Sequence, residues 1–259
     1  MSHATQFDHD LALLDWHLEL GADEAIGESP VNRYNLEAPA PKPEPAAPSP
    51  VLVAPPAVPP APDTTPLAAA CPDLDSLRTA LEGFDGCALK QGARSTVFSD
   101  GFPAARVMII GEAPGREEDR EGRPFIGRAG QLLDKMFAAI GLSRYDDAPE
   151  SSLYITNVLP WRPPQNRDPS PEEIALMKPF LLRHITLAQP DFIVTMGNPS
   201  TKALRDTTQG ITKMRGQWGE VLGTPSIPLF HPAYLLRSPE LKRLAWADLL
   251  SLKARLQSP

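Results

Sequence analysis

Three residues with different chemistry each come directly after a short apolar run. Glu112 offers a carboxylate, Asn157 an amide and His231 an imidazole. Short apolar runs bounded by turn residues predict buried strands. Ligands bind at the carboxyl ends of the strands in an open α/β sheet. The sequence therefore predicts that these three groups meet at one edge of a sheet and form a site there.

An aromatic residue in a loop adds a fourth group. Phe125 lies between Pro124 and Gly127, after a stretch of charged residues that follows Gly111-Glu112-Ala113-Pro114-Gly115. Glycine and proline break a strand sharply, so we expect a polar loop from Arg116 to Pro124. An aromatic ring exposed on a loop is costly unless it packs on something. The ring of Phe125 is therefore a candidate for contact with a ligand.

These segments resemble the uracil-DNA glycosylase superfamily, and specifically its family 4. The resemblance covers roughly Phe84 to Leu250 and rests on ordered motifs at family-like spacing. They are Gly111–Gly115, Gly122–Leu133, Ile155–Val158 with Arg162-Pro163-Pro164, and His231-Pro232-Ala233-Tyr234-Leu235-Leu236. It implies an α/β/α fold and hydrolysis of the bond between uracil and deoxyribose, in base-excision repair. Such chemistry requires the nucleotide to be flipped out of the duplex into a pocket.

The resemblance implies a role for each group in the pocket. Phe125 would stack on the uracil face, and Asn157 would donate to O4 and accept from N3–H, a pattern opposite to that of cytosine. His231 would donate to O2 as negative charge develops there, which a neutral imidazole can do. Ala113 occupies the position where family 1 has a water-orienting aspartate, and we assign it to the uracil-binding group.

The group that positions the attacking water is left open by the sequence. Either Glu112 or a neighbouring polar residue such as Asn166 could do so, and a carboxylate could also stabilise the positive sugar. Glu112 could instead anchor the loop. Gly115 replaces the tyrosine that screens out thymine in family 1, so exclusion of thymine is unexplained.

Several residues are expected to contact DNA. Backbone N–H groups around Gly115 suit phosphates, and the His-Pro motif leads a loop that inserts into the duplex in superfamily relatives. Apolar residues fill the gap that a flipped base leaves. The expected DNA contacts are Gly115, Arg128, Lys213 and Arg215, a wedge of Tyr234, Leu235 and Leu236, and Arg237.

The chain departs from family 4 at its iron–sulfur cysteines. Only Cys87 matches, because Phe84, Trp161 and Met177 occupy the other three positions. A cluster needs four ligands. We expect no cluster and no other metal, and we expect the three replacements to pack as a small apolar plug.

The alternation of apolar runs with helical patterns predicts a fold of the α/β class. The expected strands are 107–110, 153–156, 192–196 and 227–230, and the expected helices are 73–82, 127–140, 171–189, 201–205 and 239–256. Ser170, Pro171 and Glu173 have the spacing of a helix-opening capping box. We expect a three-layer α/β/α sandwich around a four-stranded parallel sheet.

Composition divides the 259 residues into three parts. Residues 1–27 predict a short acidic amphipathic helix that could bind a protein partner, 28–66 a disordered Pro/Ala-rich linker, and 67–259 the glycosylase-like domain. The net charge of -7 belongs to residues 1–66, which hold 2 basic and 10 acidic residues, whereas residues 178–259 hold 11 basic and 5 acidic residues. With no signal peptide and no apolar run long enough to span a bilayer, we expect a cytoplasmic monomer that binds uracil-containing DNA and no membrane.

Other functions are weaker matches. The chain could be a uracil-DNA recognition module with weak or no turnover; some superfamily relatives retain DNA through an extra histidine, but Arg116 to Pro124 contains none. A nucleotide-binding protein is disfavoured because the motif after Gly111 lacks the Gly-Lys-Ser/Thr of a phosphate loop. No lysine lies in the motif loops as a nucleophile, which favours a monofunctional glycosylase without lyase activity.

Overall fold

All four apolar runs form strands in the computed structural model, which describes residues 63–257. Neighbouring strands among these four pair in parallel. They are β2 (Val107–Gly111), β3 (Leu153–Asn157), β4 (Phe192–Met196) and β6 (Thr224–Leu229). Each bound lies within three residues of the predicted one, and the class of fold is confirmed as α/β.

The sheet has six strands rather than the four expected. Its order is β1-β3-β2-β4-β6-β5, and the two edge strands, β1 (Asp100–Gly101) and β5 (Gly219–Val221), pair antiparallel. The prediction of a purely parallel sheet was wrong at both edges. These strands are two and three residues long and contain no apolar run, so the hydrophobic pattern could not reveal them.

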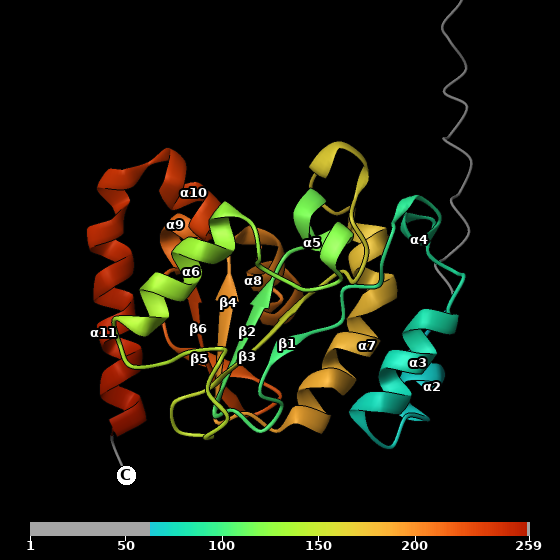
Figure 1. Ribbon diagram of the computed structural model, residues 1–259, viewed down its shortest axis with the longest axis horizontal. Coiled ribbons are helices and arrows are strands. Elements are labelled where there is room, and N and C mark those ends of the chain that lie inside the picture. The colour runs from blue at the N-terminus through green and yellow to red at the C-terminus, as the bar shows by residue number, and fades with distance from the viewer. Residues whose placement is uncertain (1–62, 258–259) are drawn as a thin grey trace, which may run out of the picture. The chain divides into compact units, whose positions relative to one another are not determined.

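The five expected helices are also present, together with shorter ones (Figure 1). The α-helices are α2 (Thr65–Ala69), α3 (Leu74–Gly83), α4 (Leu89–Gly92), α5 (Arg116–Glu121), α6 (Arg128–Ala138), α7 (Pro171–Ala188), α8 (Asn198–Arg205), α9 (Ile211–Met214), α10 (Pro232–Arg237) and α11 (Lys242–Gln257). Two 3₁₀ turns are η2 (Pro164–Asn166) and η3 (Pro239–Leu241). The capping box of α7 is confirmed: Ser170 accepts from the N–H of Glu173, whose carboxylate accepts from the N–H of Ser170.

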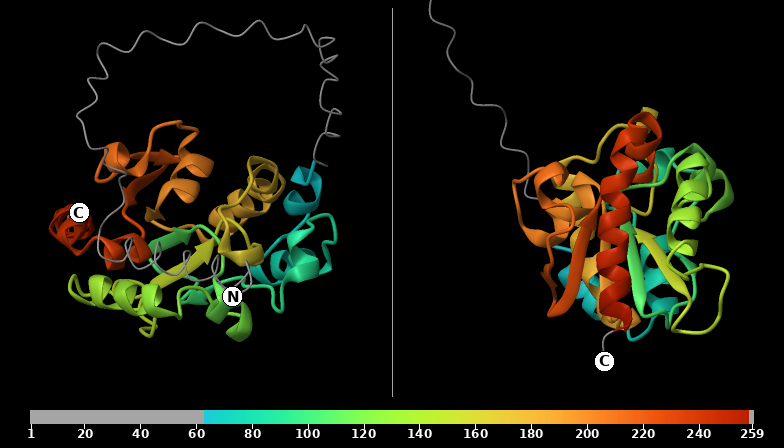
Figure 2. Two further views of the ribbon diagram at one scale, coloured as in Figure 1. Left: turned by 90° about the horizontal axis from the view of Figure 1, so that it is seen from above. Right: turned by 90° about the vertical axis from the view of Figure 1, so that its left-hand side faces the viewer.

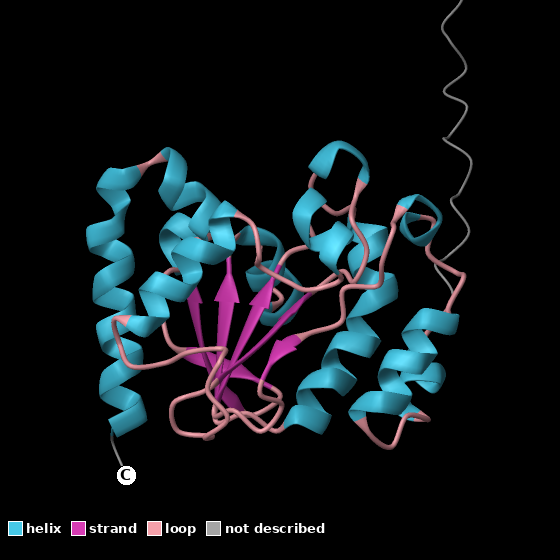
Figure 3. Cartoon of the chain, in the orientation of Figure 1, coloured by secondary structure: helices cyan, strands magenta, loops and turns pink. Residues whose placement is uncertain are grey.

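Helices cover both faces of the sheet (Figure 3). Side chains alternate along a strand, so Met108 and Ile110 of β2 pack with α3, α7 and α8, whereas Val107 and Ile109 pack with α6 and α11. Figure 2 shows the same layers from two further sides, with α11 running along the direction of the strands. No helix in residues 63–257 is long and apolar enough to cross a bilayer.

Three local expectations are corrected. The stretch after Gly115 contains helix α5 instead of a continuous polar loop, and the residues expected as an inserting loop form helix α10. The folded region begins before residue 67, because α2 starts at Thr65 and the hydroxyl of Thr64 donates to the carbonyl of Leu176. The acidic helix predicted in residues 1–27, and the linker up to residue 62, lie outside the described residues.

The path of the chain places a crevice at the end of β2. From β2 the chain passes through α6 to β3 on one side; from β3 it passes through α7 to β4, on the other side of β2. The connection that leaves the carboxyl end of β2 runs to β3, whereas the one that leaves the adjacent β4 runs the opposite way, toward β5 and β6. Connections that leave two adjacent strands in opposite directions separate their loops and open a crevice, where ligands bind in open α/β sheets. Glu112 follows β2 directly, so it lies at this crevice.

Candidate active site

A cavity of about 640 Å³ opens at the carboxyl ends of the parallel strands. Its volume is in the range of small-molecule sites. It brings together all six residues predicted for catalysis or uracil binding and three predicted for DNA contact. They are Glu112, Ala113, Gly115, Phe125, Asn157, Asn166, His231, Tyr234 and Arg237. The sequence motifs, spread over more than a hundred residues, therefore converge on one cavity.

The ring of Phe125 and the amide of Asn157 lie against the same glycine. Gly111 and Asn157 are paired in register at the ends of β2 and β3. A Cβ on Gly111 would overlap both the Oδ1 of Asn157 and the ring of Phe125. Both side chains are buried, with 7% and 5% exposure. Gly111 is thus required for close approach, and it seats an amide edge beside an aromatic face.

His231 completes this arrangement beside the ring of Phe125. Its ring stacks with that of Phe125, with centroids 5.3 Å apart and planes at 29°. It caps helix α10, because its Nδ1 accepts a hydrogen bond from the N–H of Ala233 at 3.1 Å. An imidazole nitrogen that accepts carries no proton, so the neutral ring holds its hydrogen on Nε2.

Burial lowers the pKa of His231 to about 4, helped by the positive charge of Arg237 and opposed by Glu118. At neutral pH the ring is therefore uncharged. Its Nε2–H is a fixed neutral donor, as the sequence-based role for this residue requires.

Glu112 shares the cavity with a second carboxylate. Burial and the negative charge of Asp168 raise the pKa of Glu112 to about 7. Near neutral pH the Glu112 side chain can therefore be present in both its charged and its neutral form. Nothing in the sequence pattern pointed to Asp168, which lies far from the motif of Glu112 along the chain and reaches the cavity through the loop after η2.

Asn166 lines the cavity from an exposed position in η2. Its backbone has a positive φ of 54°, which Asn tolerates better than most residues. Its Oδ1 accepts from Nε of Arg162 at 2.7 Å. The amide nitrogen remains as the group that can face a ligand or a water.

The predicted DNA contacts divide into exposed and structural residues. Arg128, Lys213, Leu236 and Arg237 are exposed, and Tyr234 is partly exposed. Leu235 is only 1% exposed and belongs to a small core cluster with Phe230, so it packs inside the protein here, and its place in a wedge stays a prediction.

Arg215 also has a structural position. Its guanidinium is paired with Asp248 of α11 and donates to the carbonyl of Leu244. These bonds fasten the end of α9 to α11, so the side chain already has protein partners, and its expected DNA contact stays a prediction. The sequence showed its charge but not its partner.

Glu118 lines the cavity and was missed by the motif analysis. Its carboxylate accepts from the N–H of Gly115, at the start of α5, and from two N–H groups that follow Phe125. The three-residue spacing from Gly115 to Glu118 is that of a capping box. Recognising a helix in this stretch would have identified it.

The four positions expected to carry iron–sulfur ligands lie in or against one large apolar core cluster. Cys87, Trp161 and Met177 are buried in one core cluster, and Phe84 packs against it with its ring 5.6 Å from that of Phe180. Within residues 63–257 no three His, Cys, Asp or Glu side chains are grouped to hold a metal ion. One thiol among indole, phenyl and thioether groups does not fit an iron–sulfur cluster, which needs four thiolates or equivalent donors.

Together these groups suit a flat, polar heterocycle. The cavity offers an aromatic face, an amide that can donate and accept, a neutral N–H donor and a carboxylate that can be charged or neutral near neutral pH. Such a set can hold a planar ring by its edge and receive negative charge on it.

Comparisons with known proteins agree with this geometry. Residues 98–250 match the family described as "Uracil DNA glycosylase superfamily". The chain is 36% identical to a type-4 uracil-DNA glycosylase of Sulfurisphaera tokodaii over 198 residues, 72% of this chain and 86% of that protein. It is 41% identical to one of Thermotoga maritima over 172 residues, 65% of this chain and 86% of that protein. A type-5 uracil-DNA glycosylase of Pyrobaculum aerophilum is 31% identical over 143 residues, which are 51% of this chain and 62% of that protein.

Proposed function

Because the chain belongs to the uracil-DNA glycosylase superfamily, we propose that it hydrolyses the N-glycosidic bond of a deoxyuridine flipped out of DNA. The products are uracil and an abasic site. The observation that carries the proposal is the convergence of three groups in one cavity: Phe125 and Asn157 lie against Gly111, and His231 stacks with the ring of Phe125.

Binding of the base uses the ring and the amide. Phe125 stacks on the uracil face, a contact worth roughly 1–3 kcal/mol per base. Asn157 donates from its amide nitrogen to O4 and accepts from N3–H through Oδ1. Cytosine carries an amino donor where uracil has O4 and an acceptor nitrogen at N3. It would therefore leave both the amide nitrogen and the Oδ1 of Asn157 buried without a partner. Discrimination against cytosine follows from that cost.

His231 acts on the leaving group. As the bond to the sugar breaks, negative charge moves onto uracil O2, and the Nε2–H of the neutral ring donates to that oxygen. The pKa near 4 makes the ring an uncharged donor over the physiological range. A donor already aimed at developing charge stabilises the transition state without reorganisation.

Glu112 is the better of the two candidates for handling water. The Oδ1 of Asn166 already accepts from Arg162, and an amide cannot take up a proton. An ionised Glu112 orients the water, accepts its proton as oxygen bonds to the sugar carbon, and lowers the energy of the positive sugar. Asn166 donates to the same water. Ala113 leaves room beside the base.

DNA is held by exposed groups around the cavity. The N–H groups near Gly115 and the cations of Arg128, Lys213 and Arg237 contact phosphates. Tyr234 and Leu236, which are accessible on α10, fill the space left by the flipped nucleotide.

None of these steps uses a metal or cluster, and we propose that the enzyme works without one. We also propose that it acts in DNA repair, as a monofunctional glycosylase without lyase activity.

The test is excision of uracil from a labelled oligonucleotide, followed by alkaline cleavage, with U:G, U:A and single-stranded substrates and a T:A duplex as the matched control. We expect turnover on uracil and none on the control. His231→Ala should lose about 10²–10³ in rate, the usual cost of one such donor. The variant also loses the cap of α10, so its unfolding free energy should fall by about 1 kcal/mol, while its affinity for uracil-DNA should stay close to that of the wild type.

The alternative is a recognition module that binds uracil-DNA with weak or no turnover. The observation in its favour is that Ala113 and Gly115 replace the aspartate and tyrosine of family 1. Tight binding of uracil-DNA by the wild type without any product would establish it. If the wild type shows no binding of uracil-DNA and forms no product, both functions are rejected.

A further inference from the structure

The backbone of Phe125 is held in an unusual conformation. Its φ is 54°, in the left-handed region that bulky side chains rarely adopt. Strained residues of this kind persist only where the surrounding structure over-determines them. The ring is buried and stacked with His231. The contacts that impose this conformation therefore decide where the ring lies.

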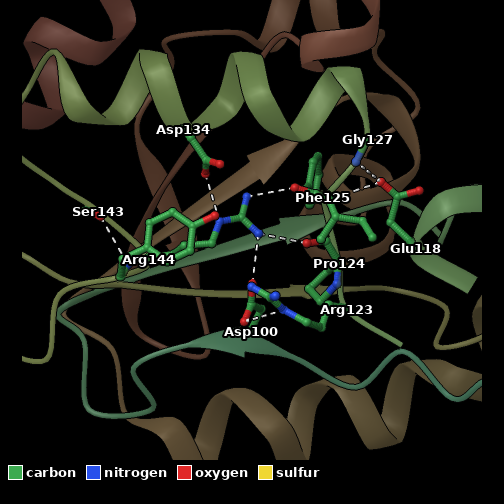
Figure 4. A network of polar contacts seen from close by, with 11 residues as sticks. Asp100, Glu118, Arg123, Pro124, Phe125, Gly127, Asp134, Ser143 and Arg144 are labelled. Carbon is green, nitrogen blue, oxygen red and sulfur yellow. Dashed lines mark hydrogen bonds and ion pairs between the residues drawn. The ribbon is translucent and has the colours of Figure 1, made fainter. Parts of the chain in front are cut away.

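The main contact is a buried arginine outside the cavity. Arg144 lies in the connection from α6 to β3, and its side chain is 1% exposed. Its Nη1 donates to the carbonyl of Pro124 at 2.8 Å and its Nη2 to the carbonyl of Phe125 at 2.9 Å (Figure 4). One planar guanidinium thus holds two consecutive peptide groups.

Two carboxylates hold the guanidinium in turn. Nε donates to Asp134 of α6 at 2.8 Å, and Nη1 donates to Asp100 of β1 at 3.1 Å. Asp100 is also paired with Arg123 at 3.0 Å, so both acids and both cations are neutralised within the group (Figure 4). A buried charge is tolerated only when it is paired and hydrogen-bonded. Arg144 therefore has one low-energy position, set by a helix and a strand.

Glu118 holds the peptide groups on the other side of Phe125. Its Oε1 accepts from the N–H of Ile126 at 3.1 Å. It also accepts from the N–H of Gly127 at 3.0 Å (Figure 4). The carbonyl groups before and at the aromatic residue point to Arg144, and the amide groups after it point to Glu118. The backbone is thus clamped from both directions, which leaves the ring little freedom to rotate.

We propose that Arg144 is a positioning residue: it holds the ring of Phe125 at the height and tilt at which it stacks on the extruded base. The proposal rests on the function proposed above for Phe125. Lysine cannot replace Arg144, because a single ammonium nitrogen cannot reach two carbonyls and two carboxylates in the fixed geometry of a guanidinium. Arg144 does not line the cavity, so its effect on excision must pass through Phe125.

A double-mutant cycle tests this coupling. Single-turnover excision is measured for wild type, Arg144→Lys, Phe125→Ala and the double variant. We expect Arg144→Lys to lower the rate at saturating DNA about tenfold in the wild-type background and less than about twofold in Phe125→Ala, where no ring remains to be positioned. Equal losses in the two backgrounds would mean that Arg144 acts only on general stability.

The matched control is Arg106→Lys. Arg106 also pairs with an aspartate, Asp191, and donates to a carbonyl, that of Leu256, but it precedes β2 at the end opposite the cavity. Its excision rate should equal that of the wild type. A loss similar to that of Arg144→Lys would overturn the proposal.

Hydrogen exchange tests the clamp without any activity. In Arg144→Lys the amides of Ile126 and Gly127 should exchange at least about tenfold faster, while those of β4 keep their protection. The clamp would be refuted if all amides exchanged faster to the same degree, or if exchange at Ile126 and Gly127 did not change. If Arg144→Lys does not fold, Asp134→Asn removes one partner and should give the same pattern more weakly. If the wild type does not excise uracil, the proposed function is rejected. The hydrogen-exchange measurement would still show whether Arg144 clamps the backbone at Phe125.

Discussion

At the scale of single residues, the pair Glu112 and Asp168 sets the protonation of the cavity. Burial is the larger cause that raises the pKa of Glu112, and the nearby negative charge of Asp168 adds to it. The carboxylate is charged above about pH 7 and neutral below. A reaction that needs the ionised form therefore speeds up as the pH rises through this value.

We expect the rate of excision by the wild type to rise through about pH 7. Asp168→Asn removes the negative charge that raises the pKa of Glu112, so Glu112 ionises at lower pH and the rising limb moves to lower pH. At pH 6 this variant should be about two- to threefold faster than the wild type. Single-turnover rates between pH 5 and pH 9 provide the measurement. In Glu112→Gln the rise of the excision rate through about pH 7 should disappear. If this variant keeps the rise, a group other than Glu112 titrates there.

The replaced cysteines carry a second prediction. Trp161 and Met177 are buried where thiolates are expected from the family-4 pattern, and Cys87 lies in the same apolar cluster. Purified protein should be colourless and contain no stoichiometric iron by elemental analysis, because three of the four positions lack a suitable donor. Burial of the indole and thioether contributes stability by the hydrophobic effect. A brown preparation with several iron atoms per chain would contradict this.

At the scale of elements, two close approaches fix the site. Helix α6 packs so near Phe125 that a Cβ on Gly130 would overlap the carbonyl of that residue, and Gly111 of β2 touches its ring in the same way. The first contact lies within the motif Gly122–Leu133, and the second joins that motif to Gly111–Gly115. They explain why a loop between two helices can hold an aromatic side chain as firmly as a strand would.

Gly130→Ala should disturb the site through this contact. The added methyl group must push α6 away from the carbonyl of Phe125, which costs about 1–3 kcal/mol of unfolding free energy, as overpacking usually does. Excision should fall with it, because the ring shifts. Gly83→Ala is the matched control, since a Cβ at this last residue of α3 meets nothing within 4 Å. Thermal melts and excision rates check both; a silent Gly130→Ala would disprove the close approach.

At the scale of the whole molecule, the folded region starts earlier than composition suggested. Thr64 is 3% exposed and donates to α7 at 2.7 Å, although it lies among the prolines and alanines of the expected linker. Composition averages over a window and hides a single docked residue. The edge of the domain was therefore decided by long-range contacts, this hydrogen bond and the packing of α2 on α7.

Two truncations test this boundary. A chain that begins at Asp63 keeps Thr64 and all of α2, and should melt like the full chain. A chain that begins at Leu67 loses the bond to the carbonyl of Leu176 and the start of α2. It should lose about 1–3 kcal/mol of unfolding free energy, the usual cost of a buried group left without its partner. Denaturant unfolding compares the stability of the two truncated chains. Equal midpoints would show that the folded domain begins at or after Leu67.

Sequence alone determined the parts of this protein that depend on local pattern. The apolar runs of β2, β3, β4 and β6 and the capping box at Ser170 are short-range signals, and the structure confirms them. The motif residues of the cavity were also found, because each comes directly after a strand or lies in a motif loop. Their convergence followed from the rule that parallel strands end at one edge.

Tertiary structure decided what depends on partners distant in sequence. It placed Asp168 near Glu112, buried Leu235, engaged Arg215 with Asp248, and set Arg144 behind Phe125. The edge strands β1 and β5 likewise exist only because a neighbouring strand offers hydrogen bonds to a few polar residues. The charge of an arginine can be read from the sequence, but whether it meets a phosphate, a carboxylate or a carbonyl depends on packing that no local pattern encodes.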